Sequence, residues 1–235
     1  MLRSDKQFTE EESRLLDLCL MLHSEHGGGN NSTFSVRVLT SSGTDTYSAI
    51  AAGIGSLKGP RHGGANYKVV QQLAEIKQHV SNWEDDAEVR DYLHKIVSRQ
   101  AGDGSGLIYG MGHAVYTKND PRAAILKKNA IAMATGTDFE KEFLLLDAVE
   151  RLAPEVLAEK RGSPQLCCAN IDLYSGLVYQ MLRIPEELHT PLFAIARTAG
   201  WCAHRLEELC TNGKLMRPAY KAIAREIPYL PLDRR

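Results

Sequence analysis

Residues Gly110-Met111-Gly112-His113-Ala114-Val115, followed by Asp120-Pro121-Arg122, form the stretch from which the rest of the chain is interpreted. The two glycines allow tight backbone turns before His113. Asp is a favoured N-cap and Pro a favoured first helical residue, so we expect a helix to begin here with Arg122 in its first turn. A helix N-terminus with an added guanidinium attracts a carboxylate or a phosphate. The stretch favours a site for a small anionic carbonyl compound; taken alone, a turn with a surface His and a surface Arg is an equally good interpretation.

Length and composition indicate an ordinary globular protein. The chain has 235 residues, 43% of them hydrophobic, and a formal net charge of -1, which predicts one or two domains. Its 28 Lys and Arg are balanced by 29 Asp and Glu, which argues against a nucleic-acid-binding protein. Since no apolar stretch is long enough to span a membrane and the first residues do not resemble a signal peptide, we expect a cytoplasmic protein.

The cysteines and the paired histidines predict neither disulfides nor a metal centre. No two cysteines have C-x-x-C spacing, so a reducing compartment and a role as small apolar fillers are expected for Cys19, Cys167, Cys168, Cys202 and Cys210. His23 and His26 have i, i+3 spacing, but no third and fourth ligand follows at a suitable distance. We therefore expect no metal site.

Helical patterns dominate the chain. Thr9 and Glu12 form a capping box for a first helix that runs to about Glu25. Residues 33–40 alternate like a strand, yet no partner strand is evident, so a helix is favoured there. Further helices are expected over 45–58, 64–76, 86–100, from Pro121, over 137–157, 177–182 and from a Thr190-Pro191 cap to Gly213.

Glycines mark close packing and loops. Gly53 and Gly55 each cost roughly 1 kcal/mol inside the 45–58 helix, so close approach of another helix, in a core or a subunit interface, is expected. The glycine-rich segments 26–30 and 59–66 suit a ligand loop and a hinge. The cluster at 102–106 is not a dinucleotide fingerprint, because no apolar strand precedes it.

Taken together, these motifs resemble the C-terminal part of citrate synthase, in the family's order and at comparable spacing across nearly the whole chain. The resemblance rests on His23-Ser24-Glu25-His26-Gly27-Gly28-Gly29-Asn30, Gly59-Pro60-Arg61-His62-Gly63-Gly64-Ala65-Asn66, Gly110-Met111-Gly112-His113-Ala114-Val115, Asp120-Pro121-Arg122 and Asn170-Ile171-Asp172. Family members usually carry a further helical N-terminal portion that is not in this sequence.

The resemblance implies an all-α, citrate synthase-like fold and a homodimer. It implies a helical large domain with an inserted smaller helical domain, the N-terminal part of the large domain being missing. The large domain would comprise 1–63 and 184–235, and the small CoA-binding domain 64–183. The 45–58 helix would lie at the dimer interface.

The family reaction condenses acetyl-CoA with oxaloacetate and water to give citrate and CoA. Thioester methyl protons are very weakly acidic, so the reaction needs a base and a donor to the forming enolate oxygen. The resemblance assigns the base to Asp172, the donor to His62, and the polarisation and protonation of the oxaloacetate carbonyl to His113.

The resemblance also assigns the binding residues. The two carboxylates of oxaloacetate would meet His26, Arg122, Arg197 and, from the partner subunit, Arg217, since planar guanidinium groups suit carboxylates. The CoA-binding residues would be Gly110, Met111, Gly112, Ala114, Val115 and Asn170. Acetyl-CoA is a substrate, and no cofactor, metal, nucleic acid or membrane partner is expected.

Structural interpretations compete with these roles when each residue is considered alone. Asp172 suits a helix N-cap, by roughly two to one. Arg197 and Arg217 suit surface ion pairs, His26 a bond to a loop carbonyl, and His62 a hinge position. No chemistry is expected of His94, His189 and His204.

Two alternative functions remain open at this stage. A 2-methylcitrate synthase would use propionyl-CoA through the same residues, and one methylene provides only about 1–3 kcal/mol of discrimination. A truncated, non-catalytic chain that dimerises or binds CoA is the other. For either synthase, the site draws on both domains, so oxaloacetate is expected to bind first and to favour a closed arrangement.

Overall fold

The structure is a computed structural model that describes residues 5–59, 62–113, 116, 118–162, 167–211, 213–219, 221, 223 and 229–234. Within these residues every regular element is a helix, which confirms the all-α prediction. The elements are α1 (Glu10–His23), α2 (Asn31–Ser41), α3 (Thr46–Leu57), α4 (Ala65–His79), α5 (Asp86–Val97), α6 (Pro121–Ala134), α7 (Glu140–Arg161), α8 (Asp172–Met181), η1 (Glu186–Leu188), α9 (His189–Cys210) and η2 (Leu232–Arg234). None of the described helices combines the length and apolarity required to cross a membrane.

Local capping chemistry sets several helix starts as predicted. Thr9 Oγ1 accepts the Glu12 N–H at 3.1 Å, and the Glu12 carboxylate accepts the Thr9 N–H at 2.8 Å, completing the capping box of α1. Asp120 caps α6 by accepting the Arg122 N–H at 3.0 Å, with Pro121 as the first helical residue. Each cap satisfies backbone donors that a helix start leaves without intrahelical partners.

The helix favoured over residues 33–40 is confirmed as part of α2. Its alternation of apolar residues does not reflect a strand: Val36 is fully buried, whereas Phe34 is exposed. Residues two apart lie on different faces of a helix, so only one of this pair can face the core.

Other boundaries were predicted wrongly. α9 begins at His189, directly after the η1 turn, so Thr190 and Pro191 lie within its first turn and do not form the cap. Pro is tolerated there because an N–H in the first turn has no intrahelical acceptor. The same helix ends at Cys210, before Gly213. α7 extends to Arg161 and ends at Gly162, whose φ of +67° suits a glycine C-cap.

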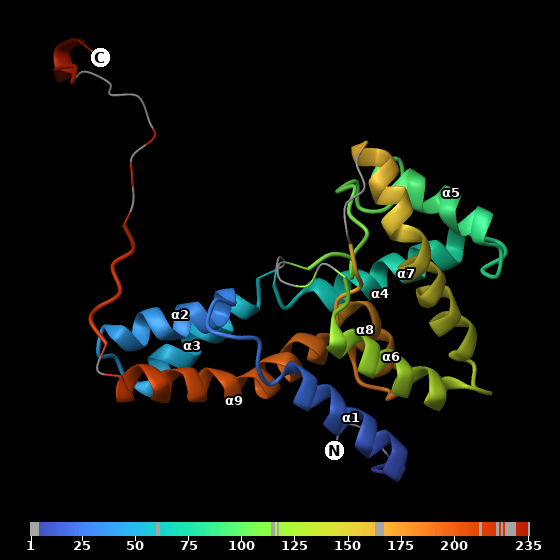
Figure 1. Cartoon of the computed structure of the whole chain (residues 1–235), viewed down its shortest axis with the longest axis horizontal. Helices are drawn as coiled ribbons and strands as arrows, with labels where there is room; N and C mark the ends of the chain where they lie inside the picture. The colour runs from blue at the N-terminus through green and yellow to red at the C-terminus, as the bar shows by residue number, and fades with distance from the viewer. Residues whose placement is uncertain are drawn as a thin grey trace.

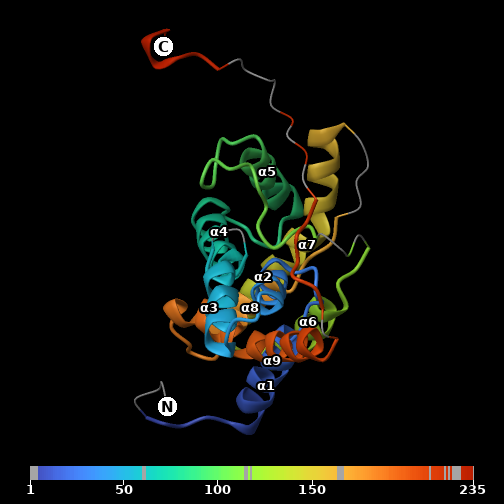
Figure 2. The same ribbon diagram turned by 90° about the vertical axis from the view of Figure 1, so that its left-hand side faces the viewer.

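The helices form two cores (Figures 1 and 2). The larger core lies among α4 to α8 and includes Leu15 and Cys19 of α1. The smaller core lies among α2, α3 and α9, which run side by side in Figure 1, and consists of Val36, Ala49, Leu57, Phe193 and Trp201. The chain passes from the smaller-core helices to the larger after α3 and returns before α9. The domain boundaries at 63/64 and 183/184 stay a prediction.

The two glycines of α3 differ in their surroundings. A Cβ at Gly53 would lie 2.8 Å from Val36 Cγ2 and 3.1 Å from Trp201 Cδ2, which confirms the expected close helix packing at this residue. A Cβ at Gly55 would meet no atom within 4 Å, so no packing within this chain requires a glycine there.

The cysteines and the C-terminal segment complete the description. All five cysteines are free thiols, and Cys19 is fully buried in the larger core.

Beyond α9 the chain extends away from the helices (Figure 1), and the described residues 213–219 are mostly exposed. Met216 N–H donates to Ser41 Oγ at 3.1 Å, which anchors the start of this segment to α2.

Candidate active site

His113 lies on the glycine-rich loop before α6. Gly110 has φ +80°, and a Cβ there would lie 2.8 Å from Leu173 Cα, so only glycine fits. His113 Nδ1 accepts the Tyr116 N–H at 3.0 Å. Its Nε2 lies 3.1 Å from His26 Nε2.

Arg122 is held in place by its own helix cap. Its Nε donates to Asp120 Oδ1 at 3.1 Å and its Nη2 to Asp120 Oδ2 at 2.8 Å, and the Asp120 carboxylate is fully buried. The same Nη2 lies 3.2 Å from His113 Nε2. The expected first-turn position of Arg122 is confirmed, and this bidentate contact fixes its guanidinium beside His113.

Arg197 is fully buried on α9, so the interpretation as a surface ion pair is wrong. Its Nε donates to the carbonyl oxygen of His23 at 2.6 Å, and the guanidinium lies 4.9 Å from the centre of the Phe193 ring. Both Nη atoms are buried and, among the described residues, neither has a hydrogen-bond partner. Burial lowers the pKa of Arg197 to about 10, so the group remains a cation at neutral pH.

His26 and His62 lie on the loops beside α2. The His26 and His113 rings stack, with centroids 5.1 Å apart and planes 2° apart. His62 Nε2 lies 3.0 Å from Ser32 Oγ and 3.1 Å from Asn30 Oδ1. Burial, and then the charge of the Arg197 guanidinium, lowers the pKa of His62 to about 4, so its ring is neutral at pH 7.

Asp172 is the first residue of α8, and the N-cap interpretation is wrong. Ile171 occupies the cap position, and the Asp172 N–H donates to Asn170 Oδ1 at 3.0 Å. Burial raises the pKa of Asp172 from its usual 3.8 to about 6, although the charges of Arg122 and Arg197 oppose this shift. A carboxyl group with a pKa near 6 suits a general base.

Asn170 ties the loop of His113 to the helix of Asp172. Its N–H donates to Gly110 O and its side-chain Nδ2 to Gly112 O, each at 2.9 Å. Between them, Met111 and Ala169 form an isolated antiparallel bridge. These bonds connect two segments almost 60 residues apart in the sequence.

Electrostatic effects between the candidate residues indicate that they share one site. The Arg197 cation lowers the pKa of both His62 and Asp172, and the Arg122 cation lowers that of both His113 and Asp172. Such effects act over short distances in a partly buried site. The arrangement offers a carboxylate base, neutral imidazoles and two guanidinium groups that suit an anionic carbonyl compound.

A cavity of about 680 Å³ adjoins this site. It is lined by Met111, Gly112 and His113, and by cationic side chains that sequence reasoning did not single out: Arg99, Lys160 and Arg161. Arg99 follows the end of α5, and Lys160 and Arg161 are the last residues of α7. No sequence motif connects these three cations, so only the fold shows that they line one cavity. Ala114 and Val115, also expected at a CoA site, lie outside the described residues.

Two remaining expectations concern Arg217 and metal ions. Arg217 is exposed in the 213–219 segment, and its expected role stays a prediction. In the part of the chain that the structure describes, no three His, Cys, Asp or Glu side chains are grouped to hold a metal ion.

Comparison with known proteins shows that the chain is similar to citrate synthases and 2-methylcitrate synthases. Citrate synthase of Synechocystis sp. is 40% identical over 224 residues, which are 95% of this chain and 52% of that protein. 2-Methylcitrate synthase 1 of Corynebacterium glutamicum is 34% identical over 96% of this chain and 54% of its own length. The chain thus spans about half the length of the curated relatives it matches.

Solved structures agree with these relatives. Citrate synthase of Thermoplasma acidophilum, in a ternary complex with carboxymethyl coenzyme A and oxaloacetate, superposes with a TM-score of 0.80 at 30% identity over 98% of this chain and 57% of that one. Citrate synthase of Thermotoga maritima gives a TM-score of 0.77 at 32% identity, over 97% of this chain and 57% of that one. The model of the citrate synthase C-terminal domain matches residues 1–219, and the chain therefore belongs to the citrate synthase family.

Proposed function

We propose that this chain carries most of the active site of an acyltransferase that condenses acetyl-CoA with oxaloacetate and water to give citrate and CoA. The observation that carries the proposal is the Arg197 guanidinium, which is fully buried with both Nη atoms unpartnered among the described residues. A buried cation without a counterion costs several kcal/mol, and a substrate carboxylate would offset that cost. Arg122 provides a second guanidinium, as a dicarboxylate requires.

Asp172 would remove a proton from the methyl group of acetyl-CoA. A pKa of about 6 makes its carboxylate more basic than an ordinary aspartate while leaving it mainly ionised at pH 7. His62 would donate a hydrogen bond to the thioester oxygen as negative charge develops there. Its Nε2–H is the donor: the Ser32 hydroxyl donates to Asn30 Oδ1 at 2.8 Å, so Ser32 Oγ at 3.0 Å and Asn30 Oδ1 at 3.1 Å both accept from Nε2, and the thioester oxygen would replace them.

His113 would polarise the ketone of oxaloacetate. Its Nδ1 accepts the Tyr116 N–H, and its Nε2 faces His26 and the Arg122 guanidinium; with the ring proton on Nε2, His113 would donate to the ketone oxygen. The enol carbon then bonds to the ketone carbon, the oxygen takes up the His113 proton, and water hydrolyses the resulting thioester to release CoA. His26, in contact with His113, would add a hydrogen bond to oxaloacetate.

The 680 Å³ cavity supports CoA as the acyl carrier. The Arg99, Lys160 and Arg161 side chains give its wall a positive charge that suits the phosphates of CoA. Met111 and Gly112 line the same cavity directly beside His113, so an acyl group entering from it would reach the candidate catalytic residues.

The proposal includes a homodimer in which the partner's tail supplies Arg217. Its support is the exposed C-terminal segment and the exposed apolar side chains Tyr47 and Ile54 on α3, the helix expected at the interface. Exposed apolar residues of this size on one helix suit a subunit contact.

Calorimetry with oxaloacetate and a thiol-release assay with acetyl-CoA test the proposal, with a full-length family member as the positive control. We expect the chain to bind oxaloacetate, and Asp172→Asn to lower any turnover by a factor of about 10² or more while binding is retained. Turnover of Asp172→Asn at the unmodified rate, or no oxaloacetate binding by the chain, contradicts the proposal. Binding and dimerisation without thiol release would support the non-catalytic alternative.

Propionyl-CoA is the second candidate acyl donor, giving 2-methylcitrate. The support is the similarity to 2-methylcitrate synthases of Corynebacterium glutamicum and Shewanella oneidensis, at 34% and 33% identity. Comparing kcat/KM for the two thioesters in the same assay decides between them.

A further inference from the structure

One face of α9 holds the segment that follows α1. Arg197 Nε donates to the carbonyl oxygen of His23 at 2.6 Å, and one turn later Gly200 N–H donates to the carbonyl oxygen of Ser24 at 3.1 Å. A Cβ at Gly200 would lie 2.5 Å from that Ser24 oxygen, so the segment approaches the helix too closely for any side chain there. Residues 23–27 are therefore fixed relative to α9.

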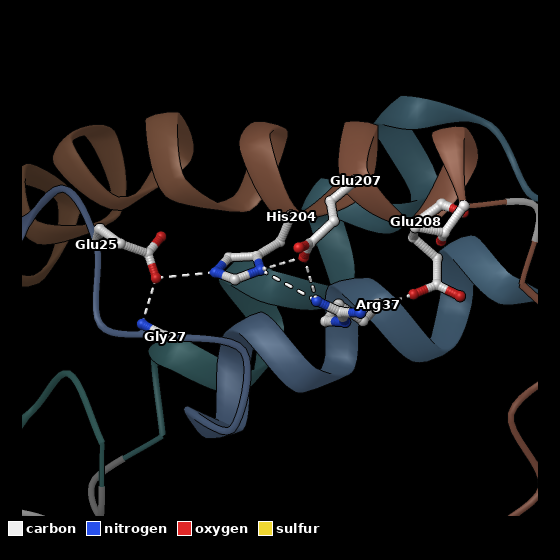
Figure 3. A network of polar contacts seen from close by, with 7 residues as sticks. Glu25, Gly27, Arg37, His204, Glu207 and Glu208 are labelled. Atoms are coloured by element: carbon white, nitrogen blue, oxygen red, sulfur yellow. Dashed lines mark hydrogen bonds and ion pairs between the residues drawn. The ribbon is translucent and has the colours of Figure 1, made fainter.

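His204, one further turn along α9, continues this set of contacts with a side chain (Figure 3). Its Nε2 lies 2.9 Å from Glu25 Oε1, and the same oxygen accepts the Gly27 N–H. Gly27 has φ +83° and its carbonyl oxygen accepts the Asn30 N–H at 3.1 Å. The Glu25 carboxylate thus closes a tight turn around His26 and joins that turn to α9.

Arg37 orients the His204 ring. Arg37 Nη1 lies 3.3 Å from His204 Nδ1 and 2.6 Å from Glu207 Oε2, while Nη2 lies 3.1 Å from the buried Glu208 carboxylate. His204 Nδ1 also lies 3.4 Å from Glu207 Oε2, so Arg37 and Glu207 together hold this edge of the ring, and the Nε2–H is directed at the Glu25 carboxylate, which can only accept. Two carboxylates hold Arg37, Arg37 and Glu207 fix the orientation of the His204 ring, and His204 sets the position of Glu25.

We propose that His204 is a positioning residue for His26, acting through Glu25 to hold the 25–27 turn where the His26 ring meets His113. The consequence for substrate rests on the proposed function, because His26 would bind oxaloacetate there. A ring that is displaced by even part of an ångström loses hydrogen-bond geometry, which weakens steeply with angle and distance.

The experiment uses the full chain and two measurements. The first is the NMR signal of the His26 ring, identified by its loss in His26→Ala. The second is the dissociation constant for oxaloacetate from calorimetry. His204→Ala should shift the His26 signal and weaken oxaloacetate binding about tenfold, the effect of losing one hydrogen bond to a charged group.

Two variants separate positioning from a general loss of stability. His204→Gln retains an N–H that can donate to Glu25, so it should restore the His26 signal and bring affinity within about threefold of the unmodified chain. His94→Ala removes a similar contact, His94 Nε2 to Glu159 Oε2 at 3.1 Å, between α5 and α7, and should change neither measurement.

The outcomes distinguish this inference from the proposed function. An unmoved His26 signal in His204→Ala, or equal effects of His94→Ala, overturns the positioning role. If His204→Ala does not fold, Glu25→Ala breaks the same contact from the exposed side and should give the same shift. If the unmodified chain does not bind oxaloacetate, the proposed function fails, whereas a shifted His26 signal still supports the positioning role.

Discussion

Asp172 is a carboxyl group whose burial disfavours its ionised form. Its pKa is about 6 in the folded chain, against the ordinary value of 3.8 that we take for the unfolded chain. Between pH 3.8 and about pH 6 the folded state therefore binds more protons than the unfolded state. The free energy of unfolding then falls as pH rises through this window, by up to about 3 kcal/mol. The stabilising contribution is fully present below pH 3.8 and is lost above about pH 6.

Asp172→Asn should therefore be more stable than the unmodified chain at pH 7.5, by up to about 3 kcal/mol, and nearly equal to it at pH 4. Urea unfolding of both proteins at the two pH values measures this difference. The comparison is made between variants because the neutral histidines His23 and His62, with pKa values lowered to about 3 and about 4, change the stability of both proteins in the opposite direction. A difference that does not grow with pH contradicts the raised pKa of Asp172.

Arg197→Met should separate stability from binding. Met keeps much of the side-chain volume and removes a buried charge, whose desolvation costs several kcal/mol, and this offsets the roughly 1.5–3 kcal/mol for the lost bond to the His23 carbonyl. We expect an equal or higher Tm without oxaloacetate and no rise in Tm when it is added. Thermal unfolding with and without oxaloacetate checks both, and Arg205→Met serves as a control because the Arg205 guanidinium has partners in Thr40, Thr44 and Thr46.

For single residues, the sequence predicted which side chains belong to the candidate site better than it predicted their burial and their hydrogen-bond partners. Asp172 resembles an N-cap because capping preferences are local, but the Asn170 side chain accepts its N–H. Arg197 resembles a surface arginine because burial depends on α1, far away in sequence. No role was expected for His204 because its partner, Glu25, lies 179 residues away.

Within the elements, α3 offers a matched pair of glycines. Gly53→Ala should destabilise the chain by about 1–3 kcal/mol, because its Cβ would overlap Val36 and Trp201. Gly55→Ala meets no atom and should stabilise the chain by up to about 1 kcal/mol through helix propensity. Opposite signs in urea unfolding confirm the packing, and stabilisation by both substitutions contradicts it.

Helix starts were predicted where a cap determines them and missed where tertiary contacts do. Thr9 and Asp120 bond to backbone N–H groups within three residues, so the sequence contains all the information required. At α9, the preceding η1 turn continues directly into the helix, which the Thr190-Pro191 pair does not reveal. The pairing of the 110–113 loop with Asn170 was likewise predictable only through the family resemblance, since no local pattern joins segments so far apart.

For the whole molecule, the site lies where the smaller-core helices meet the larger core. Arg197 belongs to α9 and Arg122 to α6, so a dicarboxylate bound to both would bridge the two groups of helices. Saturating oxaloacetate should therefore lower the radius of gyration measured by small-angle X-ray scattering. Arg197→Met provides the control, and an unchanged radius for the unmodified chain that binds oxaloacetate contradicts the closure.

Mixed dimers test the proposed homodimer and the proposed contribution of Arg217 from the partner subunit. Arg217→Ala and Arg197→Met should each abolish oxaloacetate binding as separate dimers. Mixing them should restore it, because one site of each mixed dimer then combines an intact Arg197 with an intact Arg217 from the partner subunit. Calorimetry after subunit exchange measures the recovery, and a lack of recovery in confirmed mixed dimers indicates that Arg217 acts in its own chain or not at all.

The Arg197 guanidinium, whose two Nη atoms have no hydrogen-bond partner among the described residues, has a consequence for the lifetime of the protein in a cell. Under the proposed function, a ligand that binds only the folded state adds RT ln(1 + [L]/Kd) to its stability, about 2.7 kcal/mol at a hundredfold excess over Kd. Proteases degrade unfolded chains preferentially, so the amount of this protein would rise and fall with the supply of its own dicarboxylate substrate.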